Sequence, residues 1–123
     1  MATVTPVVTD IAGNGSVKLF TFDLTTANND GAPIEWAQWA DRSVSMTSPA
    51  AWGTATCVLE GSNDLTSWIT LADNGGNAIS KTADGIEAVV ELTRYVRPRL
   101  SVPGTAAAIR VCILCRVNQP LRQ

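Results

Sequence analysis

Residues 57–72 read CVLEGSNDLTSWITLA, in which two strand-like runs flank the polar stretch GSNDLTS. Small or apolar residues recur at every second position through the first run, and the pattern resumes at Trp68. Gly, Ser, Asn and Asp between two such runs are typical of a chain reversal. We therefore predict an antiparallel hairpin with its loop at residues 61–67.

The residues around this loop have two possible uses. Gly61 and Asn63 tolerate left-handed backbone angles, and the side-chain oxygens of Ser62 and Asp64 accept hydrogen bonds from nearby backbone amides. With Glu60 the stretch also offers two carboxylates and an amide to a cation. Calcium collects about six to eight oxygens, however, and no further acid follows closely. We interpret the stretch as a turn and expect no metal site.

The same period of two runs through most of the chain. Runs rich in β-branched and aromatic residues are separated, at fairly even spacing, by clusters of Gly, Asn, Asp, Thr and Pro. Such spacing is typical of an antiparallel β-sandwich. We predict an all-β fold of this kind, with the jelly roll as one form of it, and strands at 16–24, 42–47, 54–60, 68–72, 85–92, 94–102 and 107–117.

The length of 123 residues suits one hydrophobic core and is too short for two ordinary ones. We expect an N-terminal arm at 1–15, a sandwich domain at 16–118 and a short C-terminal tail at 119–123. The stretch IEWAQWADR (34–42) fits either a short helical turn or an extended lead-in to the next strand.

The composition excludes several classes of protein. Hydrophobic residues make up 46% of the chain and charged residues 16%, and no apolar run approaches the ~20 residues of a bilayer span. The N-terminus lacks the pattern of a secretion signal, so we expect folding in a reducing cytosol. The absence of histidine removes Ser-His and Cys-His nucleophiles. We expect a soluble protein with no enzyme activity, no cofactor and no membrane partner.

The cysteines are Cys57, Cys112 and Cys115, an odd number. Cys112 and Cys115 form the motif CILC, which is also found at redox and zinc sites. Here the motif lies inside a strand-like run, where positions three apart point to opposite faces and cannot share a metal. We predict ordinary strand thiols.

Charge is distributed unevenly along the chain. Residues 1–91 carry eleven acids and three bases, a net charge of −8, whereas residues 92–123 carry six arginines and no acid, a net charge of +6. Arginine suits paired carboxylates and protein interfaces. Two explanations are open: the arginines form an interface, or they pair with acids on neighbouring strands.

The stretch RYVRPRLSV (94–102) divides into two faces. Tyr95, Arg97 and Arg99 share one face of the expected strand, which makes that face basic and aromatic, and the alternate residues share the other. Such a stripe is found in binders of single-stranded nucleic acid. A sequence pI of about 4.9 opposes that role, so we expect no nucleic-acid partner. Pro98 lacks an amide donor, which favours an edge strand or a bulge.

Four tryptophans are candidate anchors. Trp68 opens a strand directly after a hairpin, and we expect it to plug one end of the core. Trp36, Trp39 and Trp52 lie in or beside expected loops, where an aromatic ring serves either as a lid over the core or as an exposed contact residue.

Several of these stretches together resemble a known group of proteins. They are WADRSVSMT (39–47), TATCVLEGSNDLTSWITL (54–71), DNGGNAIS (73–80) and RYVRPRLSV (94–102). The pattern resembles small β-sandwich structural proteins of tailed bacteriophages, which include capsid decoration, or cement, proteins. The resemblance covers residues 34–117, and its most specific parts are EGSNDLTSW and RYVRPRL.

The resemblance implies a protein of the virion that is made in the host bacterial cytoplasm and binds the capsid surface. Its partners would be the major capsid protein and further copies of itself, as a dimer or trimer. It implies no catalytic residues. For the contacts we select the β-prone N-terminal arm together with candidate aromatic and basic residues: Val4, Pro6, Val7, Val8, Trp36, Trp39, Tyr95, Arg97 and Arg99.

An alternative function belongs to another class. The hairpin that joins Ser-Asn-Asp to Trp68 also resembles carbohydrate-binding sandwiches of the galactose-binding type, so a sugar-binding module of a phage fibre or adsorption structure is the second interpretation. It requires an exposed tryptophan beside Asp, Asn or Arg, and Asp41 and Arg42 follow Trp39 closely. A hydrolase is the third interpretation, and it would need an unusual active site.

Overall fold

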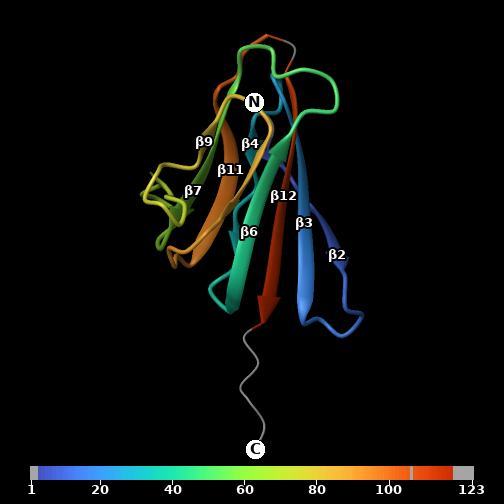
Figure 1. Cartoon of the computed structure of the whole chain (residues 1–123), viewed down its shortest axis with the longest axis vertical. Coiled ribbons are helices and arrows are strands. Elements are labelled where there is room, and N and C mark those ends of the chain that lie inside the picture. The colour runs from blue at the N-terminus through green and yellow to red at the C-terminus, as the bar shows by residue number, and fades with distance from the viewer. Residues whose placement is uncertain (1–2, 106, 118–123) are drawn as a thin grey trace, which may run out of the picture.

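The computed structural model describes residues 3–105 and 107–117, and within these ranges its regular structure consists of strands in two stacked sheets (Figure 1). Sheet A contains β1 (Thr3–Val4), β4 (Asp30–Gly31), β5 (Ile34–Glu35), β7 (Thr56–Ser62), β8 (Ile69–Thr70), β9 (Ser80–Lys81) and β11 (Tyr95–Val102). Sheet B contains β2 (Val7–Asp10), β3 (Val17–Thr25), β6 (Trp39–Thr47), β10 (Gly85–Ala88) and β12 (Ala108–Val117). The predicted β-sandwich is confirmed.

The strands pair in a nested order. β3 pairs with β12, β4 with β11, β6 with β10, and β7 with β8. Additional pairing of β12 with β6 and of β11 with β7 joins the nested pairs into two sheets. This interleaving is the strand order of a jelly roll. The pairs are antiparallel except for β1 with β4, which is parallel.

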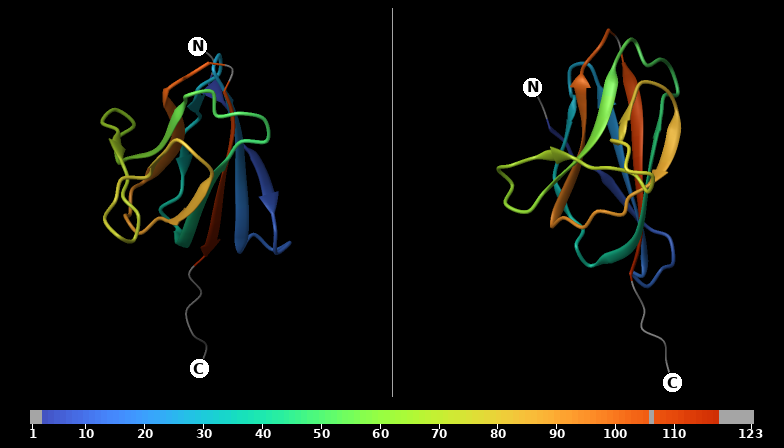
Figure 2. Two further views of the ribbon diagram at one scale, coloured as in Figure 1. Left: turned by 45° about the horizontal axis from the view of Figure 1, so that its top comes forward. Right: turned by 60° about the vertical axis from the view of Figure 1, so that its left-hand side comes forward.

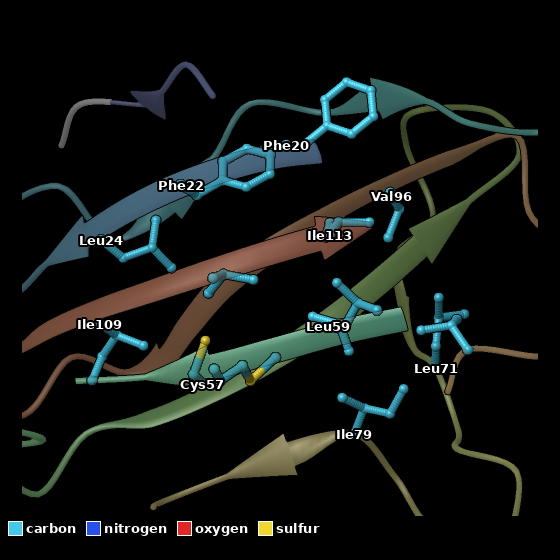
Figure 3. Packing of buried hydrophobic residues seen from close by; sticks show 14 of the residues in the cluster. Phe20, Phe22, Leu24, Cys57, Leu59, Leu71, Ile79, Val96, Ile109 and Ile113 are labelled. Atoms are coloured by element: carbon cyan, nitrogen blue, oxygen red, sulfur yellow. The ribbon is translucent and has the colours of Figure 1, made fainter. Parts of the chain in front are cut away.

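The core fills the space between the sheets (Figure 3). Phe20, Phe22 and Leu24 of β3 point inward at alternate positions, as the period of two requires. Leu59 of β7 and Val96 of β11 meet them from sheet A, and both are fully buried. Each such side chain contributes about 1.5–3 kcal/mol relative to exposure, which makes this core the main source of stability.

The observed strands follow the predicted ones closely where the strands are long. The predicted strand at 85–92 is shorter than expected, because β10 ends at Ala88. The stretch 34–42 forms β5, a turn and the start of β6, with the amide of Trp39 donating to the carbonyl of Trp36 at 2.9 Å. The strands that the sequence did not indicate are β1, β2, β4, β5 and β9, each of two to four residues.

Pro98 was expected on an edge strand or at a bulge. The edge is wrong because β11 lies inside sheet A between β4 and β7, and the register shift of β11 lies between Leu100 and Val102. The amide of Leu100 donates to Asn29 on the β4 side, so the amide that Pro98 lacks would face the same side. The partner on that side is interrupted there, since β4 ends at Gly31 and β5 begins at Ile34. Because the partner strand is interrupted at this point, Pro98 does not need a backbone amide to donate to it.

The segment predicted as an N-terminal arm contributes strands to both sheets. β1 pairs with β4 at one edge of sheet A, and β2 pairs with β3 at the edge of sheet B. Pro6 lies between β1 and β2, where the chain passes from one sheet to the other. The predicted tail at 119–123 lies outside the described residues.

Candidate interaction surfaces

The arginines of the basic C-terminal region pair with acids on neighbouring strands. The register places Arg97 opposite Glu60, Arg99 opposite Asp30, Arg110 opposite Asp23 and Arg116 opposite Asp41, and an ion pair forms in each case. Arg94 pairs with Glu35 at 2.6 Å. For these five arginines the second explanation is confirmed, and Arg122 lies outside the described residues.

Tyr95, Arg97 and Arg99 lie on the outer face of sheet A, as predicted, while Val96, Pro98 and Leu100 are buried. The Arg97 Nε atom lies 2.9 Å from Glu60 Oε1, and Arg99 Nη1 lies 3.4 Å from Glu60 Oε2. The stripe is therefore a neutralised network rather than a free basic surface.

Glu60, the last residue of the strand predicted at 54–60, belongs to this network. It lies in β7 and is only 8% exposed, and the two arginines compensate its charge from the neighbouring strand. The Arg97 guanidinium carbon lies 4.1 Å from the centroid of the Trp68 ring, so this ring extends the network. The direct opposition of Glu60 and Arg97 depends on the pairing of β7 with β11, which the sequence did not specify.

Trp36 and Trp39 lie in the core and not on the surface, with exposures of 0% and 6%. Trp36 Nε1 donates to Thr93 Oγ1 at 3.1 Å, and the Arg42 guanidinium lies 4.3 Å from the Trp36 ring centroid. Burial removes both tryptophans from the candidate contact residues, because a partner cannot reach their rings in this fold. The lid interpretation is correct for these two.

Of the other two tryptophans, Trp52 fits the lid interpretation and Trp68 differs from expectation. Trp52 packs against the core and donates from Nε1 to Asp84 Oδ1 at 2.8 Å. Trp68 does not plug the core. Its indole instead lies over Arg97 of β11, because β7 continues to Ser62 and the following loop brings the ring back over the outer face of sheet A.

Val7 and Val8 are the most exposed of the predicted contact residues. Val7 is 66% exposed and Val8 is 51% exposed, and both lie in β2. Val4 is half-buried and packs against the core, and Pro6 is also half-buried. The structure brings Val7 and Val8 together on one open edge and keeps them apart from Tyr95, Arg97 and Arg99, which belong to the other sheet.

The loop between β7 and β8 is a turn, and its side chains hold its backbone. Ser62 Oγ accepts from the amides of Asp64 and Leu65, and Asp64 Oδ1 accepts from the amides of Thr66 and Ser67 at 2.8 Å. These amide donors lower the pKa of Asp64. The predicted roles of Ser62 and Asp64 are confirmed.

The predicted left-handed positions in this loop are wrong. The residue with positive φ is Leu65, at 66°, and neither Gly61 nor Asn63 has one. Gly61 is needed for space, because a Cβ atom there would lie 2.7 Å from Thr93 Oγ1. Asn63 instead accepts a hydrogen bond from the amide of Arg94 at 2.9 Å.

A hollow of about 370 Å³ lies beside this loop, which projects from the sandwich (Figure 2). Asn63, Asp64 and Ser67 line it from the loop, and Glu91 and Leu92 line it from the opposite side. Polar and apolar groups thus meet at one concave site, which is the usual character of a small-molecule site.

The cysteines take the predicted strand positions. Cys115 is buried on the inner face of β12, whereas Cys112 lies half-buried on the outer face. Burial raises the pKa of Cys57 and that of Cys115 to about 12. Among the described residues, Cys112 is therefore the thiol that remains open to reagents.

Comparisons of this chain with known protein families, with curated proteins and with solved structures give no match. Within the described ranges, no helix is long and apolar enough to cross a membrane. The described part of the chain also contains no group of three or more Cys, Asp or Glu side chains placed to hold a metal ion.

Proposed function

We propose that this chain is a bacteriophage virion structural protein that decorates the capsid, binds the major capsid protein and stabilises the head shell. The observation that carries the proposal is the open edge of sheet B, where Val7 and Val8 are exposed. β2 is the outermost strand of that sheet, and all four of its residues are exposed. Most proteins protect such an edge with charges or a covering loop, because its free amides and carbonyls accept another strand.

The proposed contact is strand addition. An extended segment of the capsid protein pairs with the free side of β2, and its side chains contact Val7 and Val8. The jelly roll supports this role at the level of fold, since viral capsid proteins use it often, although lectins use it too. Many copies on one shell then add their binding free energies to the closed form.

The test is co-sedimentation of the purified protein with mature phage shells stripped of decoration. We expect saturable binding, with a copy number that matches symmetry positions of the shell. A chain lacking residues 2–9 loses β1 and most of β2, and we expect it not to bind. Circular dichroism of that variant establishes that the remaining sandwich is folded.

Point substitutions separate the edge from the rest of the surface. Val8→Asp places a charge on the open edge, and we expect it to weaken shell binding roughly tenfold or more. Ile69→Asp is the matched control, because Ile69 is 71% exposed but lies in sheet A. Shell binding that survives both the deletion and Val8→Asp contradicts the edge assignment. A wild-type chain that remains in the supernatant contradicts the capsid role itself.

The hollow beside the loop favours a second function, that of a carbohydrate-binding module on a fibre or adsorption structure. Asn63, Asp64 and Ser67 offer polar groups there, and Ile69 offers an apolar surface for a sugar ring. Trp68 adjoins this loop, so we expect saccharide binding to change its fluorescence. A saccharide array with no signal, and no fluorescence change with the common bacterial surface sugars, eliminates this candidate.

A further inference from the structure

The outer face of sheet B carries uncharged residues in two adjacent rows that cross the five strands. The register places these side by side in the first row: Val7, Thr21, Cys112, Ser45 and Ile86. Side chains alternate across a sheet, and the neighbouring row, which includes Phe20 and Ile113, is buried in the core. The first row therefore points outward, and Val7 and Ile86 at its ends are 66% and 68% exposed.

The second row has the same character. It consists of Thr9, Leu19, Leu114, Ser43 and Ala88. Leu114 lies on the central strand β12 and is still 42% exposed, and a hollow of about 300 Å³ lies beside it. Figure 1 shows β6, β12, β3 and β2 side by side, so the two rows form one continuous surface.

Ion pairs border this surface at both ends of the strands. Arg110 pairs with Asp23, with Nε and Oδ1 at 2.8 Å, beyond the first row. Arg116 pairs with Asp41, with Nε and Oδ2 at 3.0 Å, beyond the second row. Each pair is neutral overall, and no residue of the two rows is charged. The face thus has an uncharged centre between two acid–base pairs.

We propose that a second copy of this chain docks on the outer face of sheet B, about a two-fold axis that runs along the strands between β3 and β12. This axis lays β3 of each copy over β12 of the other. Leu19 then lies over Leu114, and Asp23 of each copy lies over Arg110 of its partner. The same surface patch serves both copies, as a two-fold interface requires.

Charge complementarity favours a second copy as the occupant. Within one chain Arg110 and Asp23 form a single pair, and the two-fold arrangement joins two such pairs into a ring of alternating charges. The strands of two sheets that pack face to face cross at about 30°. This angle displaces Asp23 of one copy from the position directly over Arg110 of the other, and the Arg110 side chain is long enough to reach it. No like charges meet at this position, so the contact is self-complementary.

The area of the contact follows from the strands that face each other across the proposed axis. The three long strands β3, β6 and β12 have nine, nine and ten residues, and β2 and β10 have four each. The proposed axis lays β12 over β3 and β6 over the short β2, and it leaves β10 of each copy outside the contact. At about 3.3 Å per residue and about 4.8 Å between strands, the overlap projects roughly 430 Å² per copy, about half of the ~800 Å² that each partner buries in a standard interface, so we expect a dimer that dissociates on dilution.

The first test is sedimentation velocity of the wild-type chain over a range of concentrations. We expect a dimer fraction that rises with concentration, and Leu114→Lys should abolish it by placing a charge at the centre of the face. Ile69→Lys is the control, since it puts the same charge on an exposed residue of sheet A and should leave the dimer unchanged. Circular dichroism verifies that both variants are folded.

A charge exchange tests the position of the axis. Asp23→Arg alone places arginines opposite Arg110 of the partner, and Arg110→Asp alone places acids opposite Asp23, so each variant should dimerise at least roughly tenfold more weakly than wild type. A mixture of the two variants restores opposite charges at both contacts. We expect heterodimers in the mixture.

Three results would overturn this inference: a wild-type chain that is monomeric at every concentration, dimers of Leu114→Lys as stable as those of wild type, or a mixture that yields no heterodimer. The first two remove the surface as a dimer contact, and the third removes the axis. None of these measurements uses shells, so their failure is distinct from failure of the proposed capsid role.

Discussion

Glu60 illustrates how one residue depends on its surroundings. Its side chain is 10% exposed, and both Arg97 and Arg99 contact it. Glu60→Gln removes the charge that compensates two arginines, so we expect the free energy of unfolding to fall by about 2–3 kcal/mol, after discounting for the partial exposure of the arginines. Glu35→Gln is the control: its pair with Arg94 is exposed, and stability should hardly change. Urea unfolding of both variants measures the difference, and equal losses would contradict a special role for Glu60.

Asp64 gives the loop a stability that depends on pH. Backbone amides hold the folded pKa below its ordinary value of 3.8, so the ionised form is favoured in the folded state. This contribution is present above the ordinary pKa and is lost as the pH falls through the lower folded value. Asp64→Asn keeps an acceptor oxygen but does not titrate. We expect thermal melts to show wild type more stable near neutral pH, with the difference shrinking below about pH 4; a constant difference would contradict this origin.

At the scale of elements, the contact between β4 and β11 depends on a missing side chain. A Cβ atom at Gly31 would lie 2.5 Å from Pro98 Cδ and 2.9 Å from the Pro98 carbonyl oxygen. Gly31→Ala should therefore force the two strands apart and lower the free energy of unfolding by about 1–3 kcal/mol. Gly75→Ala is the matched control, because the nearest atom there is 3.4 Å away. Chemical denaturation compares the two, and a neutral Gly31→Ala would show that β4 adjusts freely.

For the whole molecule, the buried thiols predict a loss of stability at alkaline pH. Unfolded cysteine has a pKa of 9.0, whereas burial raises the pKa of Cys57 and Cys115 to about 12. A raised folded pKa contributes stability that is complete below the unfolded value and is lost as pH rises through the folded one. We expect stability to decline between these two values.

The double variant Cys57→Ala, Cys115→Ala controls for lysine and tyrosine, which titrate in the same range. Its stability should be lower near neutral pH, because two buried side chains become smaller, but the alkaline decline should be shallower than in wild type. Denaturant titrations at several pH values give both slopes. An equally steep decline in the double variant would assign the effect to other groups.

The sequence by itself determined the class of fold and the face on which each side chain of the long strands lies. A period of two is a local property, so β3, β7, β11 and β12 could be recognised without knowledge of their partners. The same holds for Ser62 and Asp64, whose hydrogen bonds stay within a few residues of the chain.

The tertiary structure alone decided which strands became neighbours. Pairing of β11 with β7 buried Glu60 between two arginines, and the interrupted partner of β11 allowed Pro98 inside a sheet. The packing of neighbouring strands also buried Trp36, which the sequence analysis had selected as a contact residue. These outcomes depend on register and on contacts between residues far apart in the chain, which local periodicity does not contain.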